Sequence, residues 1–331
     1  MYGQFRDVKT TESLRGSGTA GSGLPEEKTS RAETDGLLEP KMSQEKTDGS
    51  FEPKTTQVET DSSSETKTSK PETDTNMSRC QVIARGFGNK TQVVSMSYTA
   101  PFKVMRPFYR DGKASVIVMM ASAGILDGDL FRQNYEVSAG GDLMITDQGY
   151  TKAFASRGNG SRQHVILTAG EGSTLRYLPH PMIPFPGSFH RTETTVHLGK
   201  GSRLILSDIV ACGRSRRGER FLMENYRNHL EIYLDRDLIY WDNTLLDPKG
   251  TNYESNAFFG GYSHMGSLFL YWEGREEQLV ERIRALPFGG RSGVSLSRQG
   301  VLVRALADSG DSIYEYFTQI SRFFDQANEN R

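Results

Sequence analysis

Three aspartates are notable because each lies within or beside a run of apolar residues. These runs are expected to form strands, and an ionised carboxylate inside an apolar strand is costly unless it is paired, hydrogen-bonded, hydrated or bound to a cation. If the three side chains line a wet interior passage, their hard oxygen ligands would hold a divalent ion weakly enough to release it. The aspartates are Asp129 in the run 123–131, Asp208 in 204–210 and Asp242 in 238–243.

Two further candidate donors, Cys212 and Glu219, follow Asp208 closely in the chain. A thiolate at Cys212 would add affinity for such an ion. A single cysteine after an apolar strand is, however, more often a small buried filler. The aspartates also have a purely structural explanation, because Arg106, Arg214 or a backbone amide could satisfy each of them.

Motifs of the common catalytic families are missing or lie in the wrong context. Residues 16–21 match the dinucleotide-binding glycine pattern, but no strand precedes them and no amphipathic helix follows. The sequence has no phosphate-binding loop, and its apolar part has no nucleophile elbow. None of the six histidines forms a His-x-x-x-His pair. We therefore do not expect an enzyme, and any nucleotide hydrolysis must come from another protein.

The elements that position these residues are expected to be mainly β-strands. From Gln81 onward, short runs rich in Val, Ile, Tyr and Phe are separated by Gly, Asn, Asp and Pro. Glycine-containing turns recur at similar intervals, which favours strands wound in a coil or layered in a β-helix-like manner. A β-sandwich would give nearly the same pattern. The turns are 139–141, 169–172 and 199–201, and the expected strands include 92–98, 114–121, 142–146, 164–168, 202–210, 229–234, 238–242 and 268–272.

Two helices are expected near the end of the chain, because apolar residues recur at helical spacing over 274–285 and 312–324. Ser312 and Glu315 have the capping-box arrangement at the start of the second helix. Both apolar stripes are expected to pack against the core. The second stripe is rich in aromatic residues and would also suit a partner-docking face.

The chain of 331 residues divides into two regions of different composition. Residues 1–76 contain few large apolar side chains and cannot bury enough surface to offset the entropy cost of ordering. Within them a Glu/Lys-Thr-Asp motif recurs with a constant spacing of 13 residues, which is typical of a duplicated low-complexity spacer. We predict a disordered tail over 1–76 and a single β-rich domain over 77–331. Met77 directly follows the tail and could be the start of the domain.

Charge and hydropathy argue against several classes of partner. The formal net charge of -1 gives no indication of nucleic acid or an anionic membrane. No segment approaches the roughly 18 consecutive apolar residues that cross a bilayer, and the N-terminus lacks a secretory apolar stretch. Two cysteines, Cys80 and Cys212, are too few for a disulfide framework. We therefore expect a cytoplasmic protein.

Five segments together point to one family. They read PFKVMRPFY at 101–109, AGILDGD at 123–129, LPHPMIPF at 178–185, DIVACGR and GERF within 208–221, and DNTLLDP at 242–248. In this order they resemble the urease accessory protein family UreD, called UreH in some lineages, and they are most similar to the UreH branch. The resemblance runs from about Ser97 to Phe324, which is most of the region expected to fold.

The resemblance implies a strand-rich fold with helices, in which the strands coil around an internal tunnel. It implies direct binding to the accessory protein UreF and, through it, to the GTPase UreG, in a dimeric assembly of heteromers that meets the urease apoenzyme. Ni²⁺ would pass transiently through the tunnel, with no tightly bound cofactor. Acidic residues on the family's nickel path match Asp129, Asp208 and Asp242.

Two departures from the family pattern limit this inference. The family lacks the repeat-bearing tail, and many members have Gly-Gly-Asp where this chain has 127–129, so Asp127 is either an extra ligand or a solvated turn residue. One alternative is a purely structural chaperone that recruits partners while nickel travels by another route. Another is a metal-dependent hydrolase with Asp127, Asp129 and His180 as ligands, which would bind its metal tightly.

Overall fold

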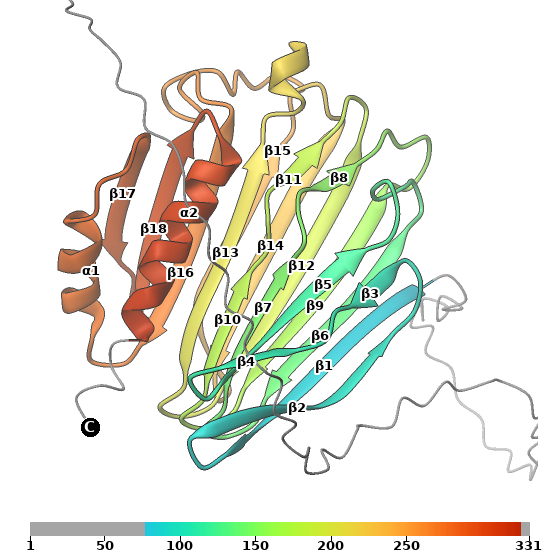
Figure 1. Cartoon of the computed structure of the whole chain (residues 1–331). Helices are drawn as coiled ribbons and strands as arrows, with labels where there is room; N and C mark the ends of the chain where they lie inside the picture. Colours follow the sequence, from blue (N-terminus) through green and yellow to red (C-terminus); the bar gives the residue numbers. More distant parts are fainter. Residues whose placement is uncertain (1–76, 326–331) are drawn as a thin grey trace, which may run out of the picture. The chain divides into compact units, whose positions relative to one another are not determined.

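The computed structural model describes residues 77–325; the tail 1–76, with its predicted disorder and its repeat, lies outside the described residues, as do residues 326–331. Within the described part, two β-sheets lie face to face and the helices α1 and α2 lie beside one of them (Figure 1). We call the sheet without helices sheet A and the other sheet B. Sheet A contains, in spatial order, β15 (Asp237–Leu246), β14 (Asn225–Leu234), β12 (Phe189–Leu198), β9 (Ser161–Ala169), β6 (Leu130–Val137), β1 (Met77–Phe87) and β2 (Lys90–Tyr98).

Sheet B carries the helices on its outer face, where α2 contacts β13, β16 and β18, and α1 contacts β17 and β18. Its strands are β17 (Arg291–Leu296), β18 (Val301–Ala307), β16 (His264–Trp272), β13 (Arg203–Ala211), β10 (Thr174–Leu178), β7 (Asp142–Asp147), β5 (Lys113–Met120) and β3 (Phe102–Val104), with β4 (Phe108–Arg110), β8 (Thr151–Ala153) and β11 (Met182–Pro184) beside this path. The helices are α1 (Glu276–Arg284) and α2 (Gly310–Ser321), with 3-10 turns η1 (Ser215–Arg217) and η2 (Arg322–Phe324).

The chain winds repeatedly from sheet A to sheet B, as the recurring turns predict. β6, β9, β12 and β14 are parallel neighbours in sheet A, and β7, β10 and β13 are parallel neighbours in sheet B. The connecting turns stack on one another, since the amide of Gly140 donates to the carbonyl of Glu171 at 2.9 Å and that of Gly172 to the carbonyl of Lys200 at 3.0 Å. The predicted mainly β, coiled arrangement with two helices is therefore confirmed.

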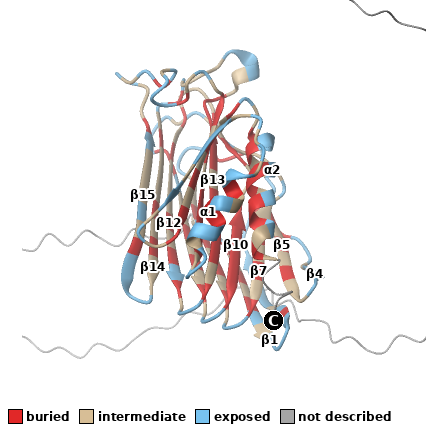
Figure 2. Cartoon of the chain, turned by 90° about the vertical axis from the view of Figure 1, so that its left-hand side faces the viewer, coloured by how far each residue is buried: buried red, intermediate tan, exposed pale blue. Residues whose placement is uncertain are grey.

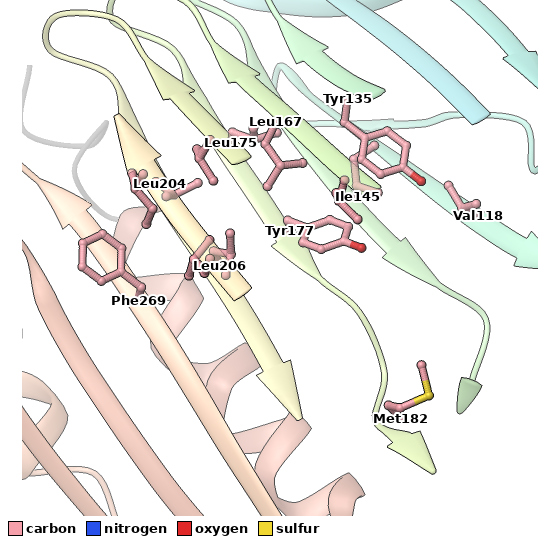
Figure 3. Packing of buried hydrophobic residues seen from close by; sticks show 14 of the residues in the cluster. Val118, Tyr135, Ile145, Leu167, Leu175, Tyr177, Met182, Leu204, Leu206 and Phe269 are labelled. Carbon is pink, nitrogen blue, oxygen red and sulfur yellow. The ribbon is translucent and has the colours of Figure 1, made fainter. Parts of the chain in front are cut away.

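Alternating side chains build two apolar layers. On β13, Leu204 and Leu206 point into the space between the sheets, while Ile205 and Ile209 belong to the cluster beneath the helices. Figure 2 shows buried residues along the strands of both sheets and on the inner faces of the helices. Figure 3 shows the packing between the sheets. Successive residues of a strand in sheet B point to opposite faces, so one face packs against sheet A and the other packs against the helices.

The helix α2 packs on sheet B, as its apolar stripe predicts. Ile313, Phe317 and Ile320 are all at most 1% exposed, so this stripe is core and not a docking face. The predicted capping box is wrong, because the helix begins at Gly310 after an extended Ser309, which places Ser312 inside the first turn. Among the described helices, none has the length and hydrophobicity needed to cross a membrane.

Replacing Gly266 by valine is expected to destabilise the domain by about 1–3 kcal/mol, because overpacking forces neighbours to shift. A Cβ atom at Gly266 would lie 2.6 Å from Cγ2 of Ile313 and 2.9 Å from Cε2 of Phe317. Urea unfolding would measure the change. Gly293→Val on β17 is the control, because a Cβ there meets nothing within 4 Å; equal unfolding midpoints for both variants would contradict the close contact of α2 with β16.

Candidate functional site

The space between the two sheets changes from apolar to polar along the strands. The strands β9, β12 and β14 are paired without a register shift, so their inward-pointing residues align in rows across the sheet. The end nearest the glycine turns is apolar and the opposite end is polar. The apolar row is Leu167, Val196 and Ile232, and the polar row is Gln163, Thr192 and Asn228.

The glycine turns also align carboxylates in sheet B. Asp147 and Asp208 are each the seventh residue after a turn glycine with positive φ, Gly140 and Gly201 respectively. The paired register of β7, β10 and β13 starts two residues after these glycines and after the equivalent Gly172. Extending that register places Asp147 and Asp208 in one row, two positions beyond the level of Tyr177.

A cavity of about 400 Å³ occupies the polar end of this space. Both sheets contribute to its walls, and the loops that follow β5 and β7 complete them. The groups that give it polar character are the carboxylates, hydroxyls, amides and imidazole of Gln133, Asp147, Gln163, Tyr177, His180, Thr192, Thr194, Asp208, Tyr226 and Asn228. The resemblance implies an internal tunnel; this cavity is a partly open pocket between the sheets, and the tunnel itself stays a prediction.

Asp208 is the one member of the six predicted site residues that lines this cavity. Tyr226 donates a hydrogen bond from its hydroxyl to Oδ1 of Asp208 at 3.3 Å, and the Asn228 side chain donates another. Burial raises the pKa of the Asp208 carboxyl, and the hydrogen bond from Asn228 opposes that rise. In residues 77–325, Asp208 forms no salt bridge within 4.0 Å. Its apolar context is therefore explained by a polar cavity and not by a paired arginine.

The carboxylate of Asp242 is satisfied by an ion pair with an arginine and not by the cavity. The guanidinium of Arg304 on β18 lies 2.6 Å from Oδ2 of Asp242 on β15, so the ion pair joins the two sheets. The partner is Arg304, and not Arg106 or Arg214 as considered from the sequence. Asp242 does not line the cavity, but its charge contributes to the raised pKa of Asp208.

Asp127 and Asp129 lie in the loop before β6, so the expectation of Asp129 inside an apolar strand is wrong. Oδ2 of Asp129 accepts the amide hydrogen of Leu126 at 2.7 Å. The carboxylate of Asp127 is exposed and accepts the amide hydrogens of Arg157 and Gly160, both at 3.0 Å. These contacts are those of turn residues, and neither side chain lines the cavity.

Cys212 and Glu219 also lie outside the cavity lining. Cys212 is 0% exposed, and burial raises the pKa of its thiol to about 11. A thiol, unlike a thiolate, is a poor metal ligand, so its environment fits the role of a buried filler. Glu219 makes a two-pronged ion pair with Arg214, whose guanidinium lies 4.3 Å from the ring centre of Phe185.

The sequence interpretation missed Asp147 as a site residue and considered His180 only for a hydrolase. Nδ1 of His180 lies 2.6 Å from Oδ1 of Asp147, and both residues line the cavity. Burial, followed by the charges of Asp147 and Asp208, raises the pKa of the Tyr177 hydroxyl, so both carboxylates act on one tyrosine. Throughout residues 77–325, no group of three or more His, Cys, Asp or Glu side chains is arranged to hold a metal ion. The ligand set of the hydrolase alternative is therefore not preassembled.

His190 lies behind the cavity wall and is 0% exposed. Its Nδ1 is 2.8 Å from the hydroxyl of Ser161, and its Nε2 is 3.1 Å from the hydroxyl of Thr192. The ring stacks on Tyr226, with 6.3 Å between the ring centres. Burial lowers the pKa of His190 to about 4. The neutral imidazole thus links the wall to the tyrosine that contacts Asp208.

Lowering the pH from 6.5 towards 4 is expected to destabilise the domain through His190, because the unfolded chain takes up a proton that the folded protein excludes. The free energy of unfolding keeps its full value above the pKa that His190 has in the unfolded chain. It falls by about 3 kcal/mol in total as the pH drops from that value through the pKa of His190 in the folded protein. His190→Gln should remove this part of the pH dependence in urea unfolding series. His197→Gln, at an exposed site on the same strand, should retain it; identical pH dependence in both variants would contradict the assignment.

Comparisons with known proteins identify the family of the chain. A family model described as "UreD urease accessory protein" matches residues 77–330. The urease accessory protein UreD of Acetivibrio thermocellus is 31% identical over 242 residues, which covers 71% of this chain and 92% of that protein. The urease accessory protein UreH of Helicobacter pylori is 30% identical over 231 residues, which covers 69% of this chain and 87% of that protein.

Proposed function

The chain belongs to the UreD family of urease accessory proteins, and we propose that it is a scaffold of urease maturation that conducts Ni²⁺ through the cavity between its sheets. A role as a urease accessory protein follows from the family membership. The relatives are accessory proteins and not catalysts, which fits a protein that is not itself an enzyme. Passage of the ion and the identity of the partners go beyond that and are argued below.

The observation that supports conduction is the carboxylate of Asp208, which faces a polar cavity without an ion-pair partner. Next to it, Oδ1 of Asn228 is buried and has no hydrogen-bond partner within residues 77–325. Buried acceptors of this kind are costly unless water or a cation satisfies them. Carboxylate, amide and hydroxyl oxygens give several weak sites, and weak successive sites allow an ion to move on.

The partners that we propose are those of the family. The chain would bind UreF directly, UreG would join through that complex, and a dimer of such heteromers would meet the urease apoenzyme. UreG would supply GTP hydrolysis, since this sequence carries no phosphate-binding loop. We place the process in the cytoplasm, where the free thiols of Cys80 and Cys212 would stay reduced.

A purely structural chaperone is the second candidate, and specific contacts favour it. Asp242 and Glu219 are bound by arginines, Asp127 and Asp129 by backbone amides, and Cys212 is buried as a thiol. These five predicted donors are thus accounted for without a metal ion. In this alternative the chain would hold apo-urease and recruit partners while nickel arrives by another route.

Complementation tests the accessory role directly. In a urease-producing host from which the UreD-family gene has been deleted, the full chain, expressed with its matching UreF and UreG, should restore the nickel content of purified urease. Elemental analysis of that urease gives the result independently of enzyme assays. Urease that stays nickel-free, although the chain is soluble and bound to UreF, would overturn the proposed function.

A further inference from the structure

His180 is held in one orientation at the cavity wall. It lies between two prolines just after β10, and both its backbone amide and its Nδ1 contact Oδ1 of Asp147, at 2.7 and 2.6 Å. The imidazole stacks on Tyr314 of α2, with 4.0 Å between the ring centres and 19° between the planes. The hydroxyl of Tyr314 is in turn 2.9 Å from that of Thr146. Two contacts therefore hold the ring, and the hydrogen bond of the amide holds the backbone beneath it.

This arrangement leaves Nε2 of His180 as the available nitrogen. A carboxylate accepts a hydrogen bond from Nδ1–H, so the lone pair of the neutral ring is on Nε2. In the part of the chain that the structure describes, no hydrogen bond to Nε2 of His180 is found. A histidine whose second nitrogen donates to a carboxylate is the usual arrangement around metal ligands, because the carboxylate sets both tautomer and orientation.

The remaining polar groups of the cavity are unsuited to choosing between divalent ions. Asp208, Asn228 and Thr192 offer oxygen ligands, which suit Mg²⁺ as well as Ni²⁺. An imidazole ligand favours Ni²⁺, which lies late in the affinity order of the first-row metals. His180 supplies that nitrogen within the same cavity as Asp208.

On the basis of the proposed function, we infer that His180 is the nitrogen ligand that makes the cavity select Ni²⁺ over Mg²⁺, with Asp147 as its positioning residue. The site is transient, because His180 and the cavity oxygens do not form a preassembled cluster within residues 77–325. Tyr177 also lines this cavity, and after burial the charges of Asp147 and Asp208 raise the pKa of its hydroxyl.

Titration calorimetry with the full chain, using Ni²⁺ alone, Mg²⁺ alone and Ni²⁺ in excess Mg²⁺, tests this inference. His180→Asn is expected to weaken Ni²⁺ binding by at least the roughly 10- to 100-fold that is typical for loss of an outer-shell partner of a metal ligand. Mg²⁺ binding should stay unchanged, because the oxygen ligands remain. Asp147→Asn should weaken Ni²⁺ binding less, since it disorders the ring without removing the ligand. The matched control is His164→Asn, because His164 also pairs with a carboxylate, Glu193 at 3.0 Å, but does not line the cavity.

The outcomes separate the inference from the function on which it rests. If His180→Asn lowers the affinities for Ni²⁺ and Mg²⁺ equally, or lowers only the melting temperature, His180 has a structural role and the inference is wrong. If Asp208→Asn weakens both ions while His180→Asn keeps the preference for Ni²⁺, conduction stands and only the selectivity assignment fails. If neither variant changes Ni²⁺ binding to a well-folded chain, the cavity does not bind the ion and both proposals fail.

Discussion

Urease matured with the Asp208→Asn variant is expected to contain at least roughly tenfold less nickel, because even the loss of an outer-shell partner of a metal ligand typically costs that much in affinity or activity. The side chain keeps its shape and can still accept the hydrogen bond from Tyr226, but it loses the charge that attracts a cation. Nickel per urease, measured by elemental analysis after co-expression with the partner proteins, gives the result.

The variant should fold at least as well as the wild type. Burial raises the pKa of Asp208, so its charged form opposes folding at pH values above that pKa. Asparagine removes this opposition, and a loss of nickel delivery cannot then be attributed to unfolding. Asp237→Asn, at an exposed position at the start of β15, is the control with the same change of charge. Normal nickel content with Asp208→Asn would exclude a conducting role for this carboxylate.

Filling the cavity without changing its charge should also stop nickel delivery. Thr194 on β12 is 6% exposed and lines the cavity, so Thr194→Phe would place a ring in the space through which the ion is proposed to pass. Because the added volume enters an existing cavity, the fold should tolerate it better than a substitution in a filled core. We expect urease nickel to fall to the level found without the chain, while UreF binding persists.

Thr195→Phe is the matched control, because successive residues of a strand point to opposite faces and Thr195 does not line the cavity. It adds the same ring one position along β12. Equal nickel delivery by both variants, together with intact assembly, would favour the purely structural chaperone. Loss of UreF binding by Thr194→Phe alone would show that the cavity shape supports the partner interface and not ion passage.

Much of the fold was predictable because the turns repeat. Gly140, Gly172 and Gly201 mark successive coils, and counting from them aligns the strands of sheet B. The same count places Asp147 in one row with Asp208, with β10 between their strands, since each is seven residues beyond its glycine.

The partners of the aspartates were not predictable in this way. Asp208 and Asp242 have similar apolar neighbours, yet Arg304 reaches Asp242 from 62 residues further along the chain and makes no ion pair with Asp208. Such a contact depends on how the late antiparallel strands β15, β16 and β18 add to the coil, which the turn repeat does not encode. Local apolar context therefore identifies a carboxylate that needs a partner but does not identify the partner.

Segment 123–129 lies in a loop and not in a strand, which changes the structural role of its aspartates. Asp129 was expected in an apolar strand, and Asp127 was expected to be either an extra ligand or a solvated turn residue. Both carboxylates accept hydrogen bonds from backbone amides in the loop before β6. Ser122, Ala123 and Gly124, at the start of this loop, do line the cavity. The contacts of Asp127 and Asp129 therefore fix a loop that forms part of the cavity wall.

Nickel transfer from loaded UreG to apo-urease, in the presence of a chelator that captures every free ion, tests passage through the cavity most directly. An assembled complex containing the wild-type chain should deliver nickel that the chelator does not intercept, and the same complex with Thr194→Phe should deliver none. Chelator-resistant delivery of equal size from both complexes would contradict an ion path between the two sheets.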